Sequence, residues 1–185
     1  MKRLLFVLPL LVLGLVSCSK HNEPSPPCDG GVCPLPSVSE TVPPVSTAPP
    51  VQVLAQENWS VSVQPGWEPM ESPLQDSHIR VFVGNKEKQN LVVFVKEPFA
   101  GTNAEYILEG IRGLKDGGYK IAGARQVDIN GNKFVLVDSS QGNVRIWMWI
   151  VAKDGFGYAL SCGGPTVDTS QEDMCTSVAN TLTIK

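Results

Sequence analysis

Basic residues and histidine are scarce in this chain, and their scarcity narrows the functions that it can have. No lysine or arginine occurs from His21 to Ile79, and the 185 residues carry a formal net charge of −3. A general nucleic-acid binder would carry a basic excess, so we exclude that class. His21 and His78 are the only histidines, which leaves little material for acid–base catalysis or metal binding.

Long apolar runs are lacking as well. The most apolar segment, Leu4 to Val16, follows a short basic start. A membrane-spanning helix takes about 20 residues, so this arrangement favours a removable export signal over a membrane-spanning anchor. Nine of the 15 prolines fall between Pro24 and Pro50, which sets a proline-rich segment apart from the rest of the chain.

The apolar segment ends in Leu15-Val16-Ser17-Cys18, which resembles the lipobox of bacterial lipoprotein precursors. The resemblance implies removal of residues 1–17 and attachment of lipid, including palmitate, to Cys18. Such a lipid would hold the protein to a membrane of the cell envelope, facing the periplasm. Because Ser19 and not aspartate follows Cys18, the resemblance favours the outer membrane over the inner one. An ordinary secreted protein with an incidental Cys18 is the alternative.

Residues 18–55 are predicted to be a disordered tether. Proline, serine and threonine prevail there, and a chain of this kind extends by about 3.1 Å per residue in polyproline II. Within it, Cys28 and Cys33 flank a Gly-Gly turn. In an oxidising compartment a small local disulfide is our leading interpretation. A metal site that adds Asp29 and His21, free thiols, and pairing with another protein stay open.

Residues 56–185 alternate between strand-like and turn-like segments, which predicts one folded domain. Asn130-Gly131 is a strong type I′ hairpin signal, and Asp154-Gly155 plays a similar role. Because Leu91–Val95 and Ile146–Ile150 are apolar on both faces, helices or the chain's own ends must cover both sides of the sheet. We therefore predict an α+β fold, with a mainly antiparallel sheet and helices packed on it. The expected strands are Trp59–Val63, Ile79–Gly84, Leu91–Lys96, Tyr119–Ile129, Lys133–Asp138, Val144–Ala152 and Gly157–Cys162.

Two helices are predicted. Thr102 caps the first helix, and Gly117-Gly118 ends it. Its expected apolar stripe comprises Ala104, Ile107, Leu108, Ile111 and Leu114. The second helix begins at Thr169 or Ser170, where Thr169 and Glu172 match a capping box. Its expected buried face comprises Met174, Cys175, Val178 and Leu182.

Cys162 and Cys175 are predicted to form a disulfide. Cys162 ends a strand, and Cys175 lies on the buried face of the second helix, so both thiols point into the layer between sheet and helix. Closing a loop of about 15 residues contributes about 3 kcal/mol of stability. Two buried, reduced cysteines are the alternative. With Cys18 lipidated, the remaining four cysteines make two pairs.

Candidate chemistry in the folded domain is sparse, and we expect no catalytic residue, metal site or cofactor. Asp76-Ser77-His78 is the one local acid–serine–histidine cluster, but neighbouring residues on an extended chain point in opposite directions and form no relay. The candidate binding residues are Trp67, Trp147 and Trp149, because aromatic anchors often carry interface energy. The competing interpretation places Trp147 and Trp149 in the core, and Trp67 either exposed or locked against the sheet.

The run from Trp59 to Trp67, with its Pro65-Gly66-Trp67 turn, resembles the start of the PsbP-like α/β/α sandwich family. A helix after the third strand, a long meander and a closing helix extend the resemblance over about 130 residues. Members of this family mostly act as binding or accessory modules without a shared catalytic site. The resemblance therefore implies a non-enzymatic protein-binding module with an envelope protein as its partner. A small-ligand carrier, with a pocket between sheet and helix, is the alternative.

Overall fold

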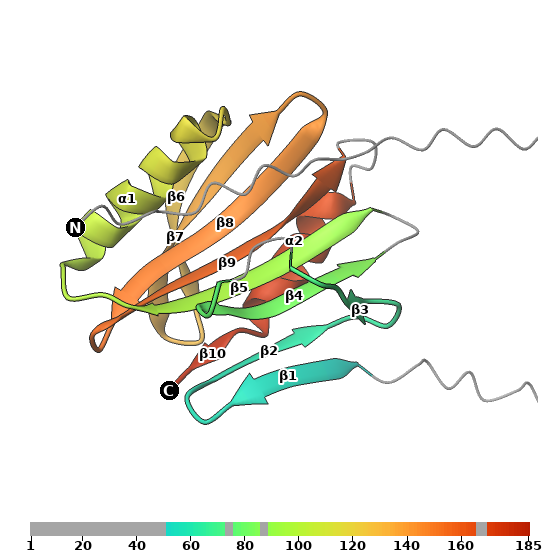
Figure 1. The fold of residues 1–185 in the computed structure, drawn as a ribbon, viewed down its shortest axis with the longest axis horizontal. Coiled ribbons are helices and arrows are strands. Elements are labelled where there is room, and N and C mark those ends of the chain that lie inside the picture. Colours follow the sequence, from blue (N-terminus) through green and yellow to red (C-terminus); the bar gives the residue numbers. More distant parts are fainter. Residues whose placement is uncertain (1–50, 73–75, 86–88, 166–169) are drawn as a thin grey trace, which may run out of the picture. The chain divides into compact units, whose positions relative to one another are not determined.

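The computed structural model describes residues 51–72, 76–85, 89–165 and 170–185, which form ten strands and two helices (Figure 1). The strands are β1 (Gln52–Gln56), β2 (Trp59–Val63), β3 (Glu68–Pro69), β4 (Ile79–Asn85), β5 (Asn90–Pro98), β6 (Lys120–Ile129), β7 (Asn132–Gln141), β8 (Val144–Lys153), β9 (Phe156–Pro165) and β10 (Thr183–Ile184). The helices are α1 (Asn103–Asp116) and α2 (Gln171–Asn180). No helix among these residues is long and apolar enough to cross a membrane.

Seven strands form one antiparallel sheet in the order β3-β4-β5-β9-β8-β7-β6, and β1-β2-β10 form a small antiparallel sheet. This topology confirms the predicted α+β fold class. The predicted hairpin turns are present too, because Asn130 and Gly131 have φ values of 50° and 77°, and Asp154 and Gly155 have 51° and 79°. Positive φ at both central residues is the signature of the type I′ turn.

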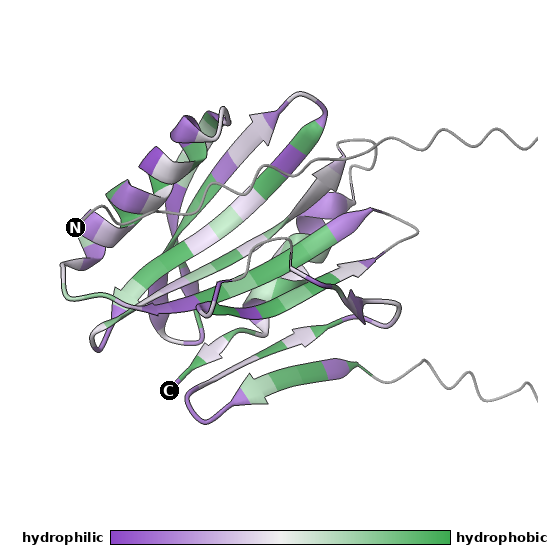
Figure 2. Cartoon of the chain, in the orientation of Figure 1, coloured by the Kyte–Doolittle hydropathy of each residue, from purple (hydrophilic) through white to green (hydrophobic). Residues whose placement is uncertain are grey.

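Both faces of the large sheet are buried, as the apolar strands predict. Trp147 and Trp149 of β8 belong to the core cluster that contains α2, whereas Met148 and Ile150 belong to the cluster under α1. Successive side chains of a strand point to opposite faces, so α1 and α2 lie on opposite sides of the sheet (Figure 1). Hydrophobic residues accordingly run along β5 and much of β8 (Figure 2).

The small sheet completes the layer that contains α2. Val61 and Val63 of β2 and Ile184 of β10 are buried in the same core cluster as Cys175. Strand β1 pairs with β2 from Gln52 onwards, although the sequence analysis places residues 52–55 in the tether. Strands β1, β3 and β10 are missing from the sequence-based prediction. Strands β3 and β10 have two residues each, too few for a periodic signal, and β1 has no buried residue.

Helix α1 begins and ends as predicted, but the face that it buries differs. The Thr102 side chain accepts a hydrogen bond from the Glu105 backbone N–H, and the Glu105 carboxylate accepts one from the Thr102 backbone N–H. Leu108 and Ala104 both belong to the expected apolar stripe, but Leu108 is 59% exposed and Ala104 is exposed too. Tyr106 is buried instead. The expectation for Leu108 was wrong, because the helix is rotated to press Tyr106 and Gly110 onto the sheet.

Glycine at position 110 permits this close approach. A Cβ atom there would lie 2.8 Å from Ile150 Cδ1, which is shorter than any normal contact. Gly110 weakens the helix intrinsically, but its missing side chain lets α1 lie directly on β8. The position therefore serves packing between helix and sheet.

Helix α2 buries the predicted face. Cys175, Val178 and Leu182 are buried and Met174 is partly buried, and Gln171 and Ala179 join them. The helix starts after Ser170, which makes no side-chain capping hydrogen bond. Thr169, the expected capping residue, lies outside the described residues.

Candidate functional site

The three candidate tryptophans all lie in the core on the α2 side of the sheet. Trp147 and Trp149 are 2% exposed and Trp67 is 5% exposed. Burial of Trp147 and Trp149 agrees with the core interpretation, and Trp67 is locked against the sheet and not exposed at its turn. None of the three offers an aromatic surface to a partner in this conformation.

The cysteines divide between the two parts of the chain. Cys162 and Cys175 form the predicted disulfide, with Cα atoms 5.5 Å apart, and it ties β9 to α2. Cys18, Cys28 and Cys33 lie outside the described residues. The lipid attachment and the second disulfide therefore stay predictions.

A cluster of charged residues lies beside Trp147 on the α2 side of the sheet. The Arg145 guanidinium is centred 4.6 Å from the Trp147 ring and donates two hydrogen bonds to the Asp138 carboxylate, at 2.9 and 2.6 Å. The hydrogen bond to Asp138 raises the pKa of Arg145. Trp147 is directly opposite Asp138 in the sheet, and its buried Nε1 has no hydrogen-bond partner among the described residues.

The charged cluster continues onto α2 and the edge of the sheet. Glu172, in the first turn of α2, lies 3.7 Å from Arg145 and 3.6 Å from Arg125 of β6. Arg125 is the most exposed member, with 63% of its side chain accessible. Two arginines and two carboxylates thus connect α2 with β6, β7 and β8, and only Arg125 presents most of its side chain to solvent.

A second polar group lies buried at the start of α2. The Gln171 side-chain amide donates a hydrogen bond to the Asn90 side-chain oxygen, and both residues are buried. Gly164 provides the space, because a Cβ atom there would lie 2.4 Å from Asn90 Oδ1. These groups satisfy one another, so we assign them a structural role in seating α2 on the sheet.

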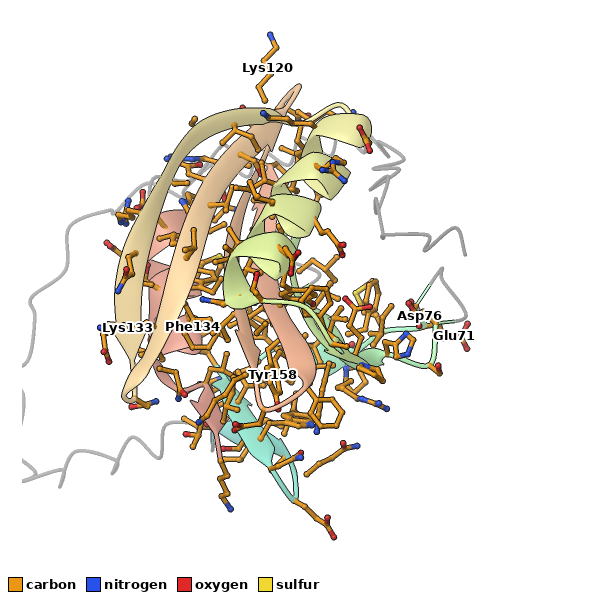
Figure 3. The ribbon with its side chains drawn as sticks, turned by 90° about the vertical axis from the view of Figure 1, so that its left-hand side faces the viewer. Glu71, Asp76, Lys120, Lys133, Phe134 and Tyr158 are labelled. Atoms are coloured by element: carbon orange, nitrogen blue, oxygen red, sulfur yellow. A yellow bond between two sulfur atoms is a disulfide. The ribbon has the colours of Figure 1, made fainter. Side chains whose placement is uncertain are left out.

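The loop before β4 brings together two residues that the sequence analysis had separated. His78 Nδ1 lies 3.0 Å from Asp76 Oδ1, and the same oxygen accepts a hydrogen bond from the His78 backbone N–H. The expectation of no contact assumed an extended chain, whereas Ser77 and His78 lie in a turn. Asp76 lies on a loop away from β6 (Figure 3), and Ser77 is exposed with no hydrogen bond to His78 among the contacts of the described residues.

Lys96 is the one buried lysine of the described residues. Its Nζ lies 4.1 Å from the centre of the Phe156 ring and 5.8 Å from that of Tyr158. Contact with aromatic faces stabilises a cation, and no carboxylate of the described residues lies within ion-pair distance. The same residues contain no group of three or more histidine, cysteine or acidic side chains that could hold a metal ion.

The longest edge strand of the described residues is β6. It has ten residues, pairs only with β7, and alternates little between buried and exposed positions. Ile129 is its one buried residue, and all positions from Ala122 to Gln126 are exposed. The sequence predicts a strand over Tyr119–Ile129, but periodicity does not reveal which strand lies at an edge.

No protein-family model matches the chain, and no curated protein sequence matches it. Among solved structures, the solution structure of cyanobacterial PsbP (CyanoP) from Synechocystis sp. PCC 6803 matches with a TM-score of 0.59 and 10% sequence identity, over 78% of this chain and 98% of that one. The domain therefore has a PsbP-like fold.

Two further structures match with lower scores. One, from Bacteroides thetaiotaomicron VPI-5482, has a TM-score of 0.49 at 14% identity, over 69% of this chain and 45% of that one. The other is PA94, a protein of unknown function from Pseudomonas aeruginosa, with a TM-score of 0.47 at 12% identity, over 73% of this chain and 97% of that one.

Proposed function

We propose that this chain is a lipid-anchored protein of the bacterial cell envelope, whose PsbP-like domain acts as a non-enzymatic, protein-binding accessory module. The lipobox that ends in Cys18 supports the anchor, and Ser19 favours the outer membrane, with the domain facing the periplasm. The observation that carries the binding role is β6, an exposed ten-residue edge strand on a domain that buries its tryptophans and both sheet faces.

The contacts in the domain favour binding over catalysis. Asp76 and His78 form a pair, but a hydrolase would also need a nucleophile within hydrogen-bond reach of the histidine. Ser77 makes no such hydrogen bond among the described contacts. The ion pairs around Arg145 are mutually satisfied and brace α2, as expected of a structural network.

The same contacts do not favour the small-ligand carrier. Trp149, Leu160 and Val178 are each at most 2% exposed and fill the layer between the sheet and α2. A carrier would need a cavity in that layer, lined with apolar side chains and a few polar groups. We therefore place the partner's binding site on the surface of the domain.

Two measurements test the proposal. Mass spectrometry of the mature protein should show an N-terminal, lipid-modified Cys18, and the Cys18→Ala variant should move from the membrane fraction to the soluble fraction. Photo-crosslinking in the native envelope should join the domain to another protein. An unmodified Cys18 would contradict the anchor, and a full-length protein that forms no crosslink from any exposed position would contradict the binding role.

A further inference from the structure

The two edge strands of the large sheet differ in how much unpaired backbone they expose to another strand. Strand β3 has two residues, so it offers little backbone to another strand. Strand β6 has ten residues that pair with β7 on one side only. An edge strand exposes a row of unpaired backbone N–H and C=O groups, which are a template for an added strand.

The register shift and the lysine that discourage another strand from pairing with β6 both lie at its beginning. The pairing with β7 shifts register between Ile121 and Gly123, and Lys120 projects away from the domain (Figure 3). Bulges and lysines are common guards of edge strands. Beyond them, the segment from Gly123 to Asp128 pairs regularly with β7 and contains no proline, so six of the ten residues of β6 form a regular ladder with an open outer side, and Arg125 and Asp128 are the charged residues among them.

The face of this segment that carries Gly123 and Arg125 leaves room and supplies a positive charge, whereas Asp128 points to the opposite face. A Cβ atom at Gly123 would meet nothing within 4 Å, so a neighbouring strand can place a large side chain beside it. Two residues later, on the same face, Arg125 is 63% exposed and reaches Glu172 at only 3.6 Å. A loose, exposed contact of this kind leaves the guanidinium able to bind a second carboxylate.

Three occupants of the edge can be compared on these grounds. The proline-rich segment of this chain is a poor strand partner, because proline has no backbone N–H to donate. A second copy, paired antiparallel around Ala124, would bring the two Arg125 side chains together as diagonal neighbours on one face, where like charges repel. An extended segment with an acidic residue beside Arg125 meets neither objection.

We propose that β6, from Gly123 to Asp128, is the docking site for an extended acidic segment of the partner protein, which adds to the sheet as an eighth strand. Backbone hydrogen bonds along the edge supply affinity. The charge of Arg125 and the space at Gly123 select the side chains on one face. This inference rests on the proposed function and specifies which surface of the domain the partner contacts.

The test uses the full-length, lipidated protein in its native envelope. A photo-reactive p-benzoylphenylalanine replaces Gln126 in β6, and in separate proteins Leu108 of α1 or Arg80 of β4, all of which are exposed. Crosslinked peptides are identified by mass spectrometry. We expect the Gln126 position to crosslink to one segment of another protein that contains acidic residues.

Two variants of matched charge test the recognition. Arg125→Glu should lower the Gln126 crosslink by up to about fivefold through the loss of one exposed ion pair, and further through repulsion between the new carboxylate and the acidic segment. Arg80→Glu makes the same charge change on β4, near the opposite edge of the sheet, and should leave the crosslink unchanged. Both residues are exposed, and thermal unfolding of both variants checks that the domain stays folded when Arg125→Glu removes the ion pair with Glu172.

The crosslinked segment then serves as a synthetic peptide for amide hydrogen exchange. Binding should protect alternate amides of β6, those that β7 does not pair, and N-methylation of the peptide should abolish this protection. Crosslinks from Gln126 to a second copy or to residues 18–50 of the same chain would overturn the acidic partner segment. Crosslinks only from Leu108 or Arg80 would overturn the β6 site and leave the proposed function standing. No crosslink from these three positions would overturn the β6 site, and no crosslink from any exposed position of the domain would overturn the proposed function as well.

Discussion

The two sides of the large sheet are built differently. The α2 side contains four tryptophans, the disulfide between Cys162 and Cys175, and the small sheet. The α1 side contains a smaller cluster around Tyr106 and Ile150, which one helix covers. The α2 side is therefore held by large buried surfaces and a covalent link, whereas the α1 side depends on one close helix–sheet contact.

The largest difference in the loss of stability should appear between substitutions at two neighbouring residues of β8. Trp149 and Ile150 are 2% and 1% exposed, and they point to the α2 and α1 sides. Trp149→Ala should lower the free energy of unfolding by about 4 kcal/mol, because it removes the larger side chain and leaves the larger cavity. Ile150→Ala should lower it by about 2 kcal/mol. Urea unfolding measures both, and equal losses would contradict the comparison.

Removing the disulfide should have the next largest effect. The Cys162→Ser/Cys175→Ser double variant should lose about 3 kcal/mol of stability, because the link joins residues 13 positions apart and closes a loop in the unfolded chain. Reducing agent should destabilise the wild-type protein by a similar amount. Cys28→Ser/Cys33→Ser is the control, and we expect almost no change, because the predicted Cys28–Cys33 disulfide would close too short a loop to stabilise the fold.

The close contact of α1 can be tested with two glycines. Gly110→Val should lower the free energy of unfolding by about 1–3 kcal/mol, because its new side chain collides with Ile150. Gly123→Val places the same side chain in open space on β6 and should be neutral or slightly stabilising, because valine favours strands. Thermal unfolding compares them, and a larger loss at Gly123 would contradict the assigned packing.

The smallest expected loss of stability comes from replacing one buried tyrosine on each side of the sheet. Tyr106 donates a 2.9 Å hydrogen bond to Glu97, and burial together with Glu97 raises the pKa of its hydroxyl. Tyr106→Phe should therefore cost about 1 kcal/mol at neutral pH. A raised pKa means that folding favours the neutral phenol, so this contribution is complete below about pH 10, the ordinary pKa of tyrosine, and is lost as the pH rises further.

Tyr158 on the α2 side supplies the control for this pH dependence. Burial and, secondarily, Asp154 raise the pKa of its hydroxyl, so Tyr158→Phe should also reduce the loss of stability at alkaline pH. The reduction should be smaller than for Tyr106→Phe, because Tyr158 lacks a carboxylate acceptor among its described contacts. Urea unfolding below and above about pH 10 measures the alkaline loss of stability for both variants. A larger reduction for Tyr158→Phe would contradict the role assigned to Glu97 at Tyr106.

Local features of the fold were predictable from the sequence. Thr102 and the Asn130-Gly131 turn act through contacts within a few residues, and the run Ile146–Ile150 is apolar on both faces of β8; each is present as predicted. The pairing of Cys162 with Cys175 followed from two local periodicities that meet in one layer. Each of these signals depends on chain geometry that neighbouring residues determine.

Features that depend on distant residues were not predictable. The sequence placed Leu108 in the core and left Trp67 undecided, because the rotation of α1 and the packing of the Pro-Gly turn depend on the sheet that they contact. Arg145, Glu172 and Arg125 come from three elements far apart in the chain, and no spacing rule links them. Asp76 and His78 are in contact because Ser77 and His78 lie in a turn, whereas the sequence suggested an extended chain.

The sequence by itself therefore determined the class of the domain, the ends of α1, its tight turns, and the expectation of a lipidated Cys18. Tertiary structure alone decided which face of α1 is buried, that the three candidate tryptophans Trp67, Trp147 and Trp149 lie in the core, and that β6 lies at an edge of the large sheet. The physical reason is the range of the interactions involved. Turns and caps are settled within a few residues, whereas edge position depends on the spatial order of all seven strands.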